Sequence, residues 1–177
     1  MVGHEGLVYR LGVGIVVINE AGLILVARRY QTQNAWQMPQ GGIDDEETPR
    51  HAAMRELKEE IGTNNVVFLA ETTQWFYYDI PRSFRASLHW RGQKQKWLLV
   101  RFVGHDDEVN LETVAKPEFD AWRWVVPQHV PKLVVWFKRA VYQAVLKEFD
   151  PLITANNRQD RELFISRANT LRACKEF

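Results

Sequence analysis

Acidic side chains are concentrated in one short part of this sequence. Seven carboxylates lie between residues 44 and 60: Asp44, Asp45, Glu46, Glu47, Glu56, Glu59 and Glu60. Like charges one helical turn apart destabilise a helix by roughly 0.2–0.5 kcal/mol per pair. Hard divalent cations such as Mg²⁺ and Mn²⁺ prefer oxygen ligands, so a bound cation would turn this repulsion into a favourable interaction. The acids therefore indicate metal chemistry, with a solvent-exposed acidic surface as the alternative.

The residues around the acids predict a helix between two end signals. Thr48 can cap its start, Pro49 suits the first helical position, and Gly62 suits the position just past the end. Between these ends an apolar residue recurs every four positions, at Ala53, Leu57 and Ile61. This spacing predicts a stripe that faces the core.

Three of the glutamates share one side of this helix. Glu56, Glu59 and Glu60 are related by i,i+3 and i,i+4 spacing and border the apolar stripe. Carboxylates at the rim of a core can hold more than one ion, an arrangement that steadies the attacking and leaving oxygens of a displacement. A purely Ca²⁺-binding surface is disfavoured because the EF-hand spacing D-x-[DN]-x-[DN]-G is absent.

A wider pattern surrounds these glutamates. From Gly41, five residues lead to Glu47, and seven more lead to Arg55-Glu56-Leu57-x-Glu59-Glu60-x-Gly62. This pattern resembles the Nudix box, the loop–helix–loop of hydrolases that cleave a nucleoside diphosphate linked to another moiety. Seven specified positions match, and residue frequencies put a chance match on the order of 10⁻⁸ per window. The resemblance implies an α/β (mixed α+β) fold, the Nudix α/β/α sandwich with a mixed sheet.

The resemblance also implies roles for the matching residues. The predicted catalytic set is Glu56, Glu59, Glu60, Arg55 and Glu47, with Arg55 paired to Glu47 and one carboxylate activating water. The predicted metal ligands are Glu56, Glu59, Glu60, the backbone carbonyl near Gln40, and Glu118 in PEFDAW. The expected ion is Mg²⁺, with Mn²⁺ or Zn²⁺ as substitutes. A non-catalytic Nudix module is disfavoured, because degenerate members lose box glutamates that this chain keeps.

Three other stretches narrow the expected substrate. WQMPQGGID (36–44), GQKQKWLLVRF (92–102) and PEFDAWRWV (117–125) resemble bacterial RNA pyrophosphohydrolases and the related asymmetric dinucleoside polyphosphate hydrolases. The similarity runs from about Tyr9 to about Phe149. It implies removal of pyrophosphate from the 5′-triphosphate end of RNA, which leaves a monophosphate and initiates RNA decay. The alternative is hydrolysis of a dinucleoside tetra- or pentaphosphate (Ap4A or Ap5A) to release ATP.

A basic segment with interleaved aromatic residues supports a polyphosphate or RNA ligand. Between residues 82 and 101 there is no acid, and six cations occur: Arg82, Arg85, Arg91, Lys94, Lys96 and Arg101. Phe84, Trp90 and Trp97 lie among them. Cations contact phosphates without reading sequence, and aromatic faces can stack bases. With the family resemblance, the predicted substrate-binding residues are Arg10, Tyr78, Lys94, Lys96 and Lys138, whereas Trp97 is expected in the core.

The remaining patterns predict a mixed sheet flanked by helices. Strands are expected at 13–18, 23–29, 66–80, 96–104 and 122–126, with a loop over 31–42. A second helix is expected over 132–149 and should end at Asp150-Pro151. We therefore expect a Nudix domain over residues 1–150 and a weakly helical or flexible tail over 151–177.

Composition restricts the class of protein. The 177 residues are 46% hydrophobic and 25% charged, with a formal net charge of +1, which indicates no overall preference for nucleic acid or membrane. The single cysteine, Cys174, excludes an internal disulfide and a thiolate metal site. The N-terminus does not resemble a signal peptide, and no segment approaches the ~20 apolar residues that cross a bilayer. We expect a cytoplasmic protein without a membrane partner, monomeric or weakly homo-oligomeric.

Overall fold

A computed structural model of the chain describes residues 8–173 except 33, 85–89 and 113–116, with side chains described up to residue 156. The strands are β1 (Tyr9–Ile18), β2 (Ile24–Arg29), β3 (Trp36–Gln37), β4 (Gln40–Gly42), β5 (Val66–Glu71), β6 (Phe76–Asp79), β7 (Gly92–Phe102) and β8 (Phe119–Val125). The α-helices are α1 (Pro49–Ile61), α2 (Val130–Leu133) and α3 (Arg139–Ala173). Single 3₁₀ turns lie at Arg82–Phe84, Asp106–Glu108, Pro127–His129 and Trp136–Lys138.

The strands form one mixed sheet. Its central pair is β1 and β7, which run parallel from the pair Tyr9–Gly92 to the pair Ile18–Arg101. β2 and β4 pair antiparallel with β1, β5 and β6 pair antiparallel with β7, and β3 and β8 pair with β2. The single strand predicted over 66–80 is in fact two strands. The chain turns at buried Thr72, whose hydroxyl donates to the carbonyl of Gln74 at 3.0 Å.

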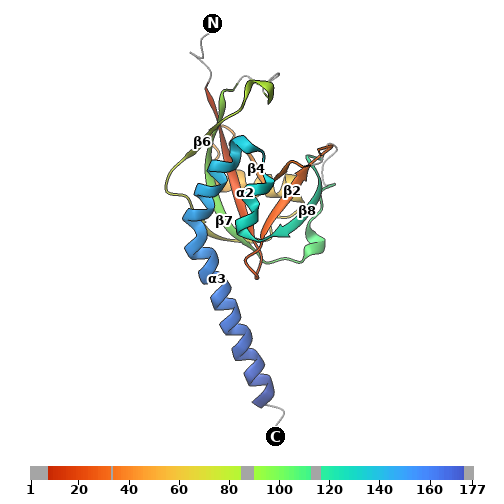
Figure 1. The fold of residues 1–177 in the computed structure, drawn as a ribbon. Coiled ribbons are helices and arrows are strands. Elements are labelled where there is room, and N and C mark those ends of the chain that lie inside the picture. The colour runs from red at the N-terminus through yellow and green to blue at the C-terminus, as the bar shows by residue number, and fades with distance from the viewer. Residues whose placement is uncertain (1–7, 33, 85–89, 113–116, 174–177) are drawn as a thin grey trace.

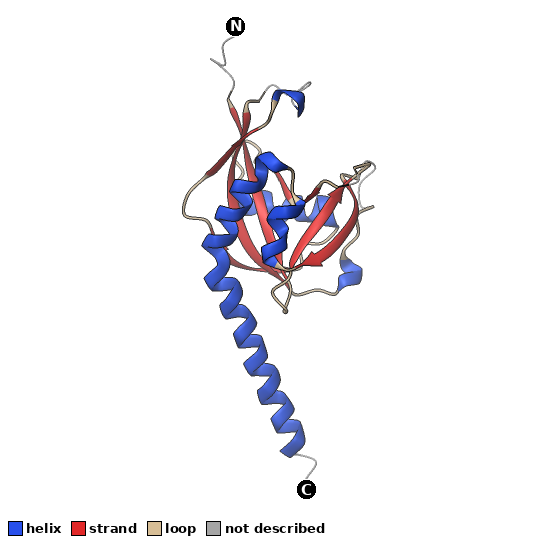
Figure 2. Cartoon of the chain, in the orientation of Figure 1, coloured by secondary structure: helices blue, strands red, loops and turns tan. Residues whose placement is uncertain are grey.

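Helices cover both faces of the sheet (Figures 1 and 2). Alternate residues of β1 point to opposite sides. Val13, Ile15 and Val17 pack in one core with the predicted stripe of α1. Val16 and Ile18 pack in the other core with α3. The predicted α/β/α sandwich is therefore confirmed, and Trp97 is fully buried as expected.

Helix α1 has the predicted ends. The Thr48 hydroxyl accepts a hydrogen bond from the His51 backbone N–H at 3.2 Å, and Pro49 follows as the first helical residue. Gly62 closes the helix with φ 79°, a left-handed conformation that costs a glycine little. These ends fix which residues of α1 reach the sheet edge, where the acidic side chains lie.

The segment predicted as a loop over 31–42 contains two short strands, β3 and β4. Pro39 separates them, and β4 pairs with β1 through Gly12–Gly42 and Val13–Gly41. A Cβ on Gly12 would lie 2.8 Å from the Gly41 carbonyl oxygen, so the glycines permit this close approach. Local loop signals missed the pairing because it depends on a strand distant in sequence.

The prediction that the second helix ends at Asp150-Pro151 is wrong. α3 continues through Pro151 to Ala173, and its C-terminal part extends away from the sheet (Figure 1). Proline lacks the N–H that would bond the carbonyl four residues earlier, at a cost of about 3 kcal/mol. The turn after Pro151 is nevertheless anchored, because Ile153 is buried in the α3-side core. In the described part of the chain, none of the helices combines the length and apolarity that crossing a membrane requires.

Candidate active site

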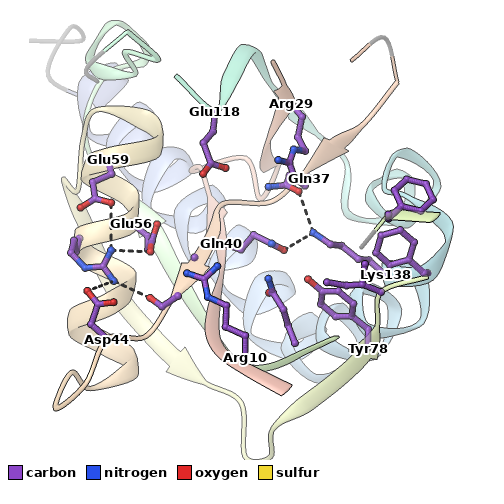
Figure 3. Close-up of a pocket in the computed structure, with 17 residues that line it drawn as sticks. Arg10, Arg29, Gln37, Gln40, Asp44, Glu56, Glu59, Tyr78, Glu118 and Lys138 are labelled. Carbon is purple, nitrogen blue, oxygen red and sulfur yellow. Dashed lines mark hydrogen bonds and ion pairs between the residues drawn. The ribbon is translucent and has the colours of Figure 1, made fainter. Parts of the chain in front are cut away.

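A pocket of about 630 Å³ opens at the edge of the sheet where α1 approaches the turn before α3. It is lined by eight of the residues predicted for the site: Arg10, Gln40, Arg55, Glu56, Glu59, Tyr78, Glu118 and Lys138. In Figure 3 Glu56 and Glu59 lie on one side of the pocket and Lys138 and Tyr78 on the other. Glu47 and Glu60 do not line the pocket. Each instead accepts hydrogen bonds from a lining residue, Glu47 from Arg55 and Glu60 from the Gln40 backbone N–H.

Arg55 and Glu47 make a two-point contact. Nε donates to Glu47 Oε1 at 3.1 Å, and Nη2 donates to Glu47 Oε2 at 2.8 Å and to the Gly42 carbonyl at 2.9 Å. The guanidinium hydrogen bond holds the pKa of Glu47 below its usual value. The predicted Arg55–Glu47 pair is therefore present, and it joins the β4 loop to the middle of α1.

The same guanidinium also reaches the acids that face the pocket. Nη1 of Arg55 lies 2.8 Å from Glu56 Oε1 and 3.4 Å from Glu59 Oε2. Burial raises the pKa of Glu56, and Arg55 opposes that rise. Arg55 thus neutralises part of the charge that the carboxylates place on this wall.

Glu60 is the most buried of the acids and is tied to the β4 segment. The Gln40 backbone N–H donates to Glu60 Oε2 at 2.9 Å. Burial raises the pKa of Glu60 well above its usual value, and the charges of Glu118 and Glu56 raise it further. Glu56 and Glu59 of α1 and Glu118 of the segment before β8 line one pocket, so their carboxylates lie in one region.

The donor set fits a hard divalent ion, although the described side chains do not form a preassembled cluster. Within residues 8–156, allowing for the gaps, no three His, Cys, Asp or Glu side chains gather closely enough to hold a metal. Oxygen donors converge from α1, from Glu118 and from the β4 backbone, and oxygen is the ligand that Mg²⁺ prefers. Gly41 permits this, because a Cβ there would overlap the Glu56 carboxylate. Glu56 and Glu59, which line the pocket, could hold such an ion.

Lys138 forms the opposite wall of the pocket. Its side chain is buried, and Nζ donates to Gln37 Oε1 at 3.2 Å and to Gln40 Oε1 at 3.1 Å. Burial lowers the pKa of Lys138 to about 7, with the Arg29 charge acting in the same direction. A buried amine that is half charged near neutral pH is expected to gain its proton when an anion enters the pocket.

The structure does not bring Lys94 and Lys96 to the pocket. Both lie on the opposite face of β7 from Trp97. Lys94 Nζ is 5.1 Å from the Trp75 ring centroid, and Lys96 Nζ donates to the Thr73 carbonyl at 3.2 Å. The alternate residues of the same strand face the site, and Gln93 lines the pocket.

Seven further lining residues are outside the predicted catalytic, metal and substrate-binding sets: Arg29, Gln37, Asp44, Ile80, Phe84, Gln93 and Phe137. Two of them had sequence signals, Asp44 as a member of the acidic cluster and Phe84 as an aromatic residue of the basic segment. Strand alternation could have found Gln93, because it lies two and four residues from Gln95 and Trp97, and Trp97 was expected inside. Gln95 Nε2 donates to Gln93 Oε1 at 2.9 Å and to Gln40 Oε1 at 3.4 Å. Arg29 and Gln37 carry no comparable local signal, since their approach depends on how β2 and β3 pair.

The fold and the site together define a Nudix-type hydrolase architecture. The sequence matches the NUDIX domain family over residues 8–145, and the chain belongs to this family. Members of the family generally need divalent metal ions.

Relatives with known names share most of this chain. A protein of Rhodospirillum rubrum named RNA pyrophosphohydrolase is 53% identical over 146 residues, which cover 81% of this chain and 88% of the relative. A protein of the same name from Rickettsia canadensis is 48% identical over 155 residues, covering 85% of this chain and 95% of the relative.

Solved structures share the fold at lower identity. A Caenorhabditis elegans Ap4A hydrolase binary complex is 18% identical, with a TM-score of 0.63, covering 82% of this chain and 98% of that one. The Escherichia coli dihydroneopterin triphosphate pyrophosphohydrolase is also 18% identical, with a TM-score of 0.60 and coverage of 77% and 96%. At this identity the similarity establishes the fold alone.

Proposed function

We propose that this protein is a metal-dependent hydrolase that removes pyrophosphate from the 5′-triphosphate end of RNA and leaves a 5′-monophosphate, a cytoplasmic step that begins RNA decay. The observation that carries the proposal is one pocket with the box carboxylates on one wall and buried Lys138 on the other. A metal-binding wall facing a cationic wall suits a polyphosphate. Relatives at about half identity carry the matching name.

The metal ligands in this proposal are Glu56, Glu59, Glu60, Glu118 and the carbonyl near Gln40. Bound divalent ions, with Mg²⁺ expected first, supply neutralisation of phosphate charge and a lower pKa for water. Glu56 is the carboxylate that we assign to accept the proton of the attacking water. It lines the pocket, where the attacking water would be held. Glu60 is too buried for this role.

The cationic side chains of the pocket bind and orient the phosphates. Arg10, Arg29 and Lys138 line it, and each can donate to a phosphate oxygen. Tyr78 and Phe137, with ring centroids 6.0 Å apart, form an apolar wall beside them that suits a nucleobase. Positioning of this kind and charge neutralisation supply most of the catalysis of phosphoryl transfer.

Hydrolysis of a dinucleoside polyphosphate is the second candidate, because the same walls also suit a polyphosphate with a base at each end. The deciding experiment measures kcat/KM on a 5′-triphosphorylated RNA and on diadenosine tetraphosphate in the same Mg²⁺ buffer. We expect the higher value on RNA, with pyrophosphate released. A value at least tenfold higher on diadenosine tetraphosphate, with ATP as product, would replace the first assignment by the second.

A further inference from the structure

A fully buried glutamine, Gln95 of β7, lies beside the pocket and has no part in the reaction as described so far. Its side chain is on the same face of the strand as Gln93 and Trp97, and none of it reaches solvent. Nε2 donates to Gln93 Oε1 at 2.9 Å and to Gln40 Oε1 at 3.4 Å. Among the described residues, the Oε1 atom of Gln95 has no hydrogen-bond partner. A buried amide oxygen without a partner lowers stability, so stability alone does not explain a glutamine here.

The neighbouring Lys138 determines how these amides are oriented. An ammonium group donates hydrogen bonds and accepts none. Lys138 Nζ lies 3.1 Å from Gln40 Oε1 and 3.2 Å from Gln37 Oε1, so both glutamines present their oxygens to it (Figure 3). Gln95 can bond the Gln40 oxygen only through its own Nε2. The donor and acceptor pattern therefore fixes the orientation of the Gln95 amide, and the unpaired oxygen is a consequence of it.

The same orientation fixes Gln93, which lines the pocket. The shorter of the two Gln95 contacts engages the Gln93 oxygen. The end of the Gln93 amide that remains for a ligand in the pocket is therefore its NH₂ group. The oxygens of a polyphosphate are acceptors, so this orientation is favourable, whereas a Gln93 amide turned by a half rotation would set oxygen against oxygen.

We propose that Gln95 is a positioning residue that holds the Gln93 amide with its NH₂ group toward the pocket, where it donates to a phosphate oxygen of the substrate. This inference rests on the proposed function and deepens it, since it adds an uncharged donor of fixed direction to the cations of the pocket. Gln95 does not itself line the pocket, so it acts through Gln93. A contact made alike to substrate and transition state changes KM and leaves kcat unchanged.

The experiment is a double-mutant cycle on Gln93 and Gln95, with steady-state kinetics on a 5′-triphosphorylated RNA. Gln95→Met keeps the length of the side chain but cannot bond the Gln93 oxygen, so KM should rise about fivefold with kcat within about twofold. Gln93→Ala removes the donor and should raise KM about tenfold, or ~1.4 kcal/mol. The double variant should match Gln93→Ala, because Gln95 then has no amide to orient, whereas independent effects would multiply to about fiftyfold.

Two further measurements separate positioning from folding. Isothermal titration with inorganic triphosphate, without divalent ions, should give a Kd about fivefold higher for Gln95→Met than for wild type. The Tm of this variant should stay within about 4 °C of wild type, because the unpaired oxygen is removed together with the hydrogen bonds. Gln143→Met, at an exposed glutamine of α3 outside the pocket lining, is the control and should change neither quantity. Gln95→Leu takes the place of Gln95→Met if the latter does not fold.

Three outcomes would overturn the proposal. An unchanged KM and Kd in Gln95→Met would mean that Gln93 keeps its orientation without Gln95. Losses that multiply in the double variant would mean that Gln95 acts on the site by a route other than Gln93. A lower kcat at unchanged KM would place its effect on the chemical step. In all three cases RNA turnover by wild type leaves the proposed reaction standing, and if wild type does not turn over RNA, the triphosphate titration still tests Gln95.

Discussion

Arg55 and Glu47 face each other across the junction of β4 and α1, with their two hydrogen bonds at 3.1 and 2.8 Å. The remaining guanidinium nitrogen contacts Glu56 and Glu59. Nε and Nη2 of Arg55 are therefore bound to Glu47 and to the Gly42 carbonyl, whereas Nη1 faces the carboxylates of the pocket. Glu47 does not itself line the pocket, and it acts on the site through Arg55 and through the Asp44 backbone N–H, which donates to Glu47 Oε2 at 3.1 Å.

Replacing Glu47 with Gln should loosen this arrangement. One carboxylate oxygen becomes an amide N–H that faces a donor, so we expect a loss of about 1 kcal/mol, or roughly 2–4 °C in Tm for a chain of this size. The kcat should also fall, because Arg55 no longer holds Glu56 in place. Thermal unfolding and steady-state kinetics test both effects, with Asp45→Asn as the control for an exposed acid of the same loop.

The pH dependence of that Tm difference has a definite sign. The pKa of Glu47 is lowered in the folded protein, chiefly by the Arg55 hydrogen bond, from an ordinary value of 4.5. The stabilisation is therefore complete above pH 4.5 and is lost as the pH falls through the lower folded value. The gap between wild type and Glu47→Gln should be constant from pH 6 to 8 and narrow below pH 4.5. A gap that widens on acidification would contradict the pairing.

Divalent metal should stabilise the protein. The carboxylates of Glu56, Glu59 and Glu60 repel one another, so an ion bound only to the folded state relieves a cost that the free protein carries. At a hundredfold excess over Kd, the gain is about 2.7 kcal/mol, or roughly 5–10 °C in Tm. Mg²⁺ and Mn²⁺ titrations by differential scanning calorimetry measure it, and Glu56→Gln should lose most of the shift. An unchanged Tm at millimolar metal would mean that these glutamates of α1 form an acidic surface that binds no divalent ion.

Substitution of Glu59 should affect catalysis with little effect on stability. Its side chain is 51% exposed, the most of the three glutamates that share this side of α1. Substitution by Gln should change stability by no more than about 0.5 kcal/mol and lower Mg²⁺-dependent kcat by on the order of 10²-fold or more. Turnover at the wild-type rate by a folded Glu59→Gln protein would sink its assignment as a metal ligand.

The sequence predicted the core of this site because its signals are local or periodic. The ends of α1 and its apolar stripe follow from spacing within one element, and the Arg55–Glu47 pair follows from the resemblance to the Nudix box. Sequence reasoning failed where a partner distant in the chain decides the outcome. β4 exists because Gly41 and Gly42 pair with β1, and α3 passes Pro151 because Ile153 reaches the core. The lysines of GQKQKW were predicted at the pocket from their charge and from family resemblance, but strand alternation directs Gln93 into the pocket lining and buries Gln95 beside it.

That placement changes the expectation for Lys94 and Lys96. From the sequence, their replacement by Ala should raise KM and flatten the salt dependence for triphosphorylated RNA. Because both now lie against Trp75 on the opposite face of β7, the double variant should keep kcat/KM on diadenosine tetraphosphate within about twofold, as substitutions without contact to the ligand do. Gln93→Ala, which removes a pocket-lining side chain on the same strand, serves as the positive control. A loss of kcat/KM in the double lysine variant equal to that in Gln93→Ala would mean that substrate also contacts the face of β7 that carries the two lysines.

The Lys138→Met substitution should raise the Tm and lower kcat/KM. The Lys138 amine is buried, and burial lowers its pKa from 10.5 to about 7. Between pH 7 and 10.5 the unfolded chain therefore binds more protons than the folded one, and wild-type stability rises with pH across this window. Below pH 7 the full cost of the buried charge remains. Methionine removes that cost, so the variant should have the higher Tm at pH 6–7, with the gap closing toward pH 10.

The same Lys138→Met substitution should lower activity. An ammonium that donates to a phosphate oxygen contributes ~1.5–3 kcal/mol, so kcat/KM should fall about 10- to 100-fold in Lys138→Met. Lys132→Met, at an exposed lysine of α2 that lies outside the pocket lining, is the matched control and should change neither quantity. Thermal unfolding from pH 6 to 10 and kinetics at pH 7.5 measure the two effects. A Tm gap that stays constant over this range would mean that Lys138 keeps its proton in the folded protein, and unchanged kinetics would remove it from the phosphate site.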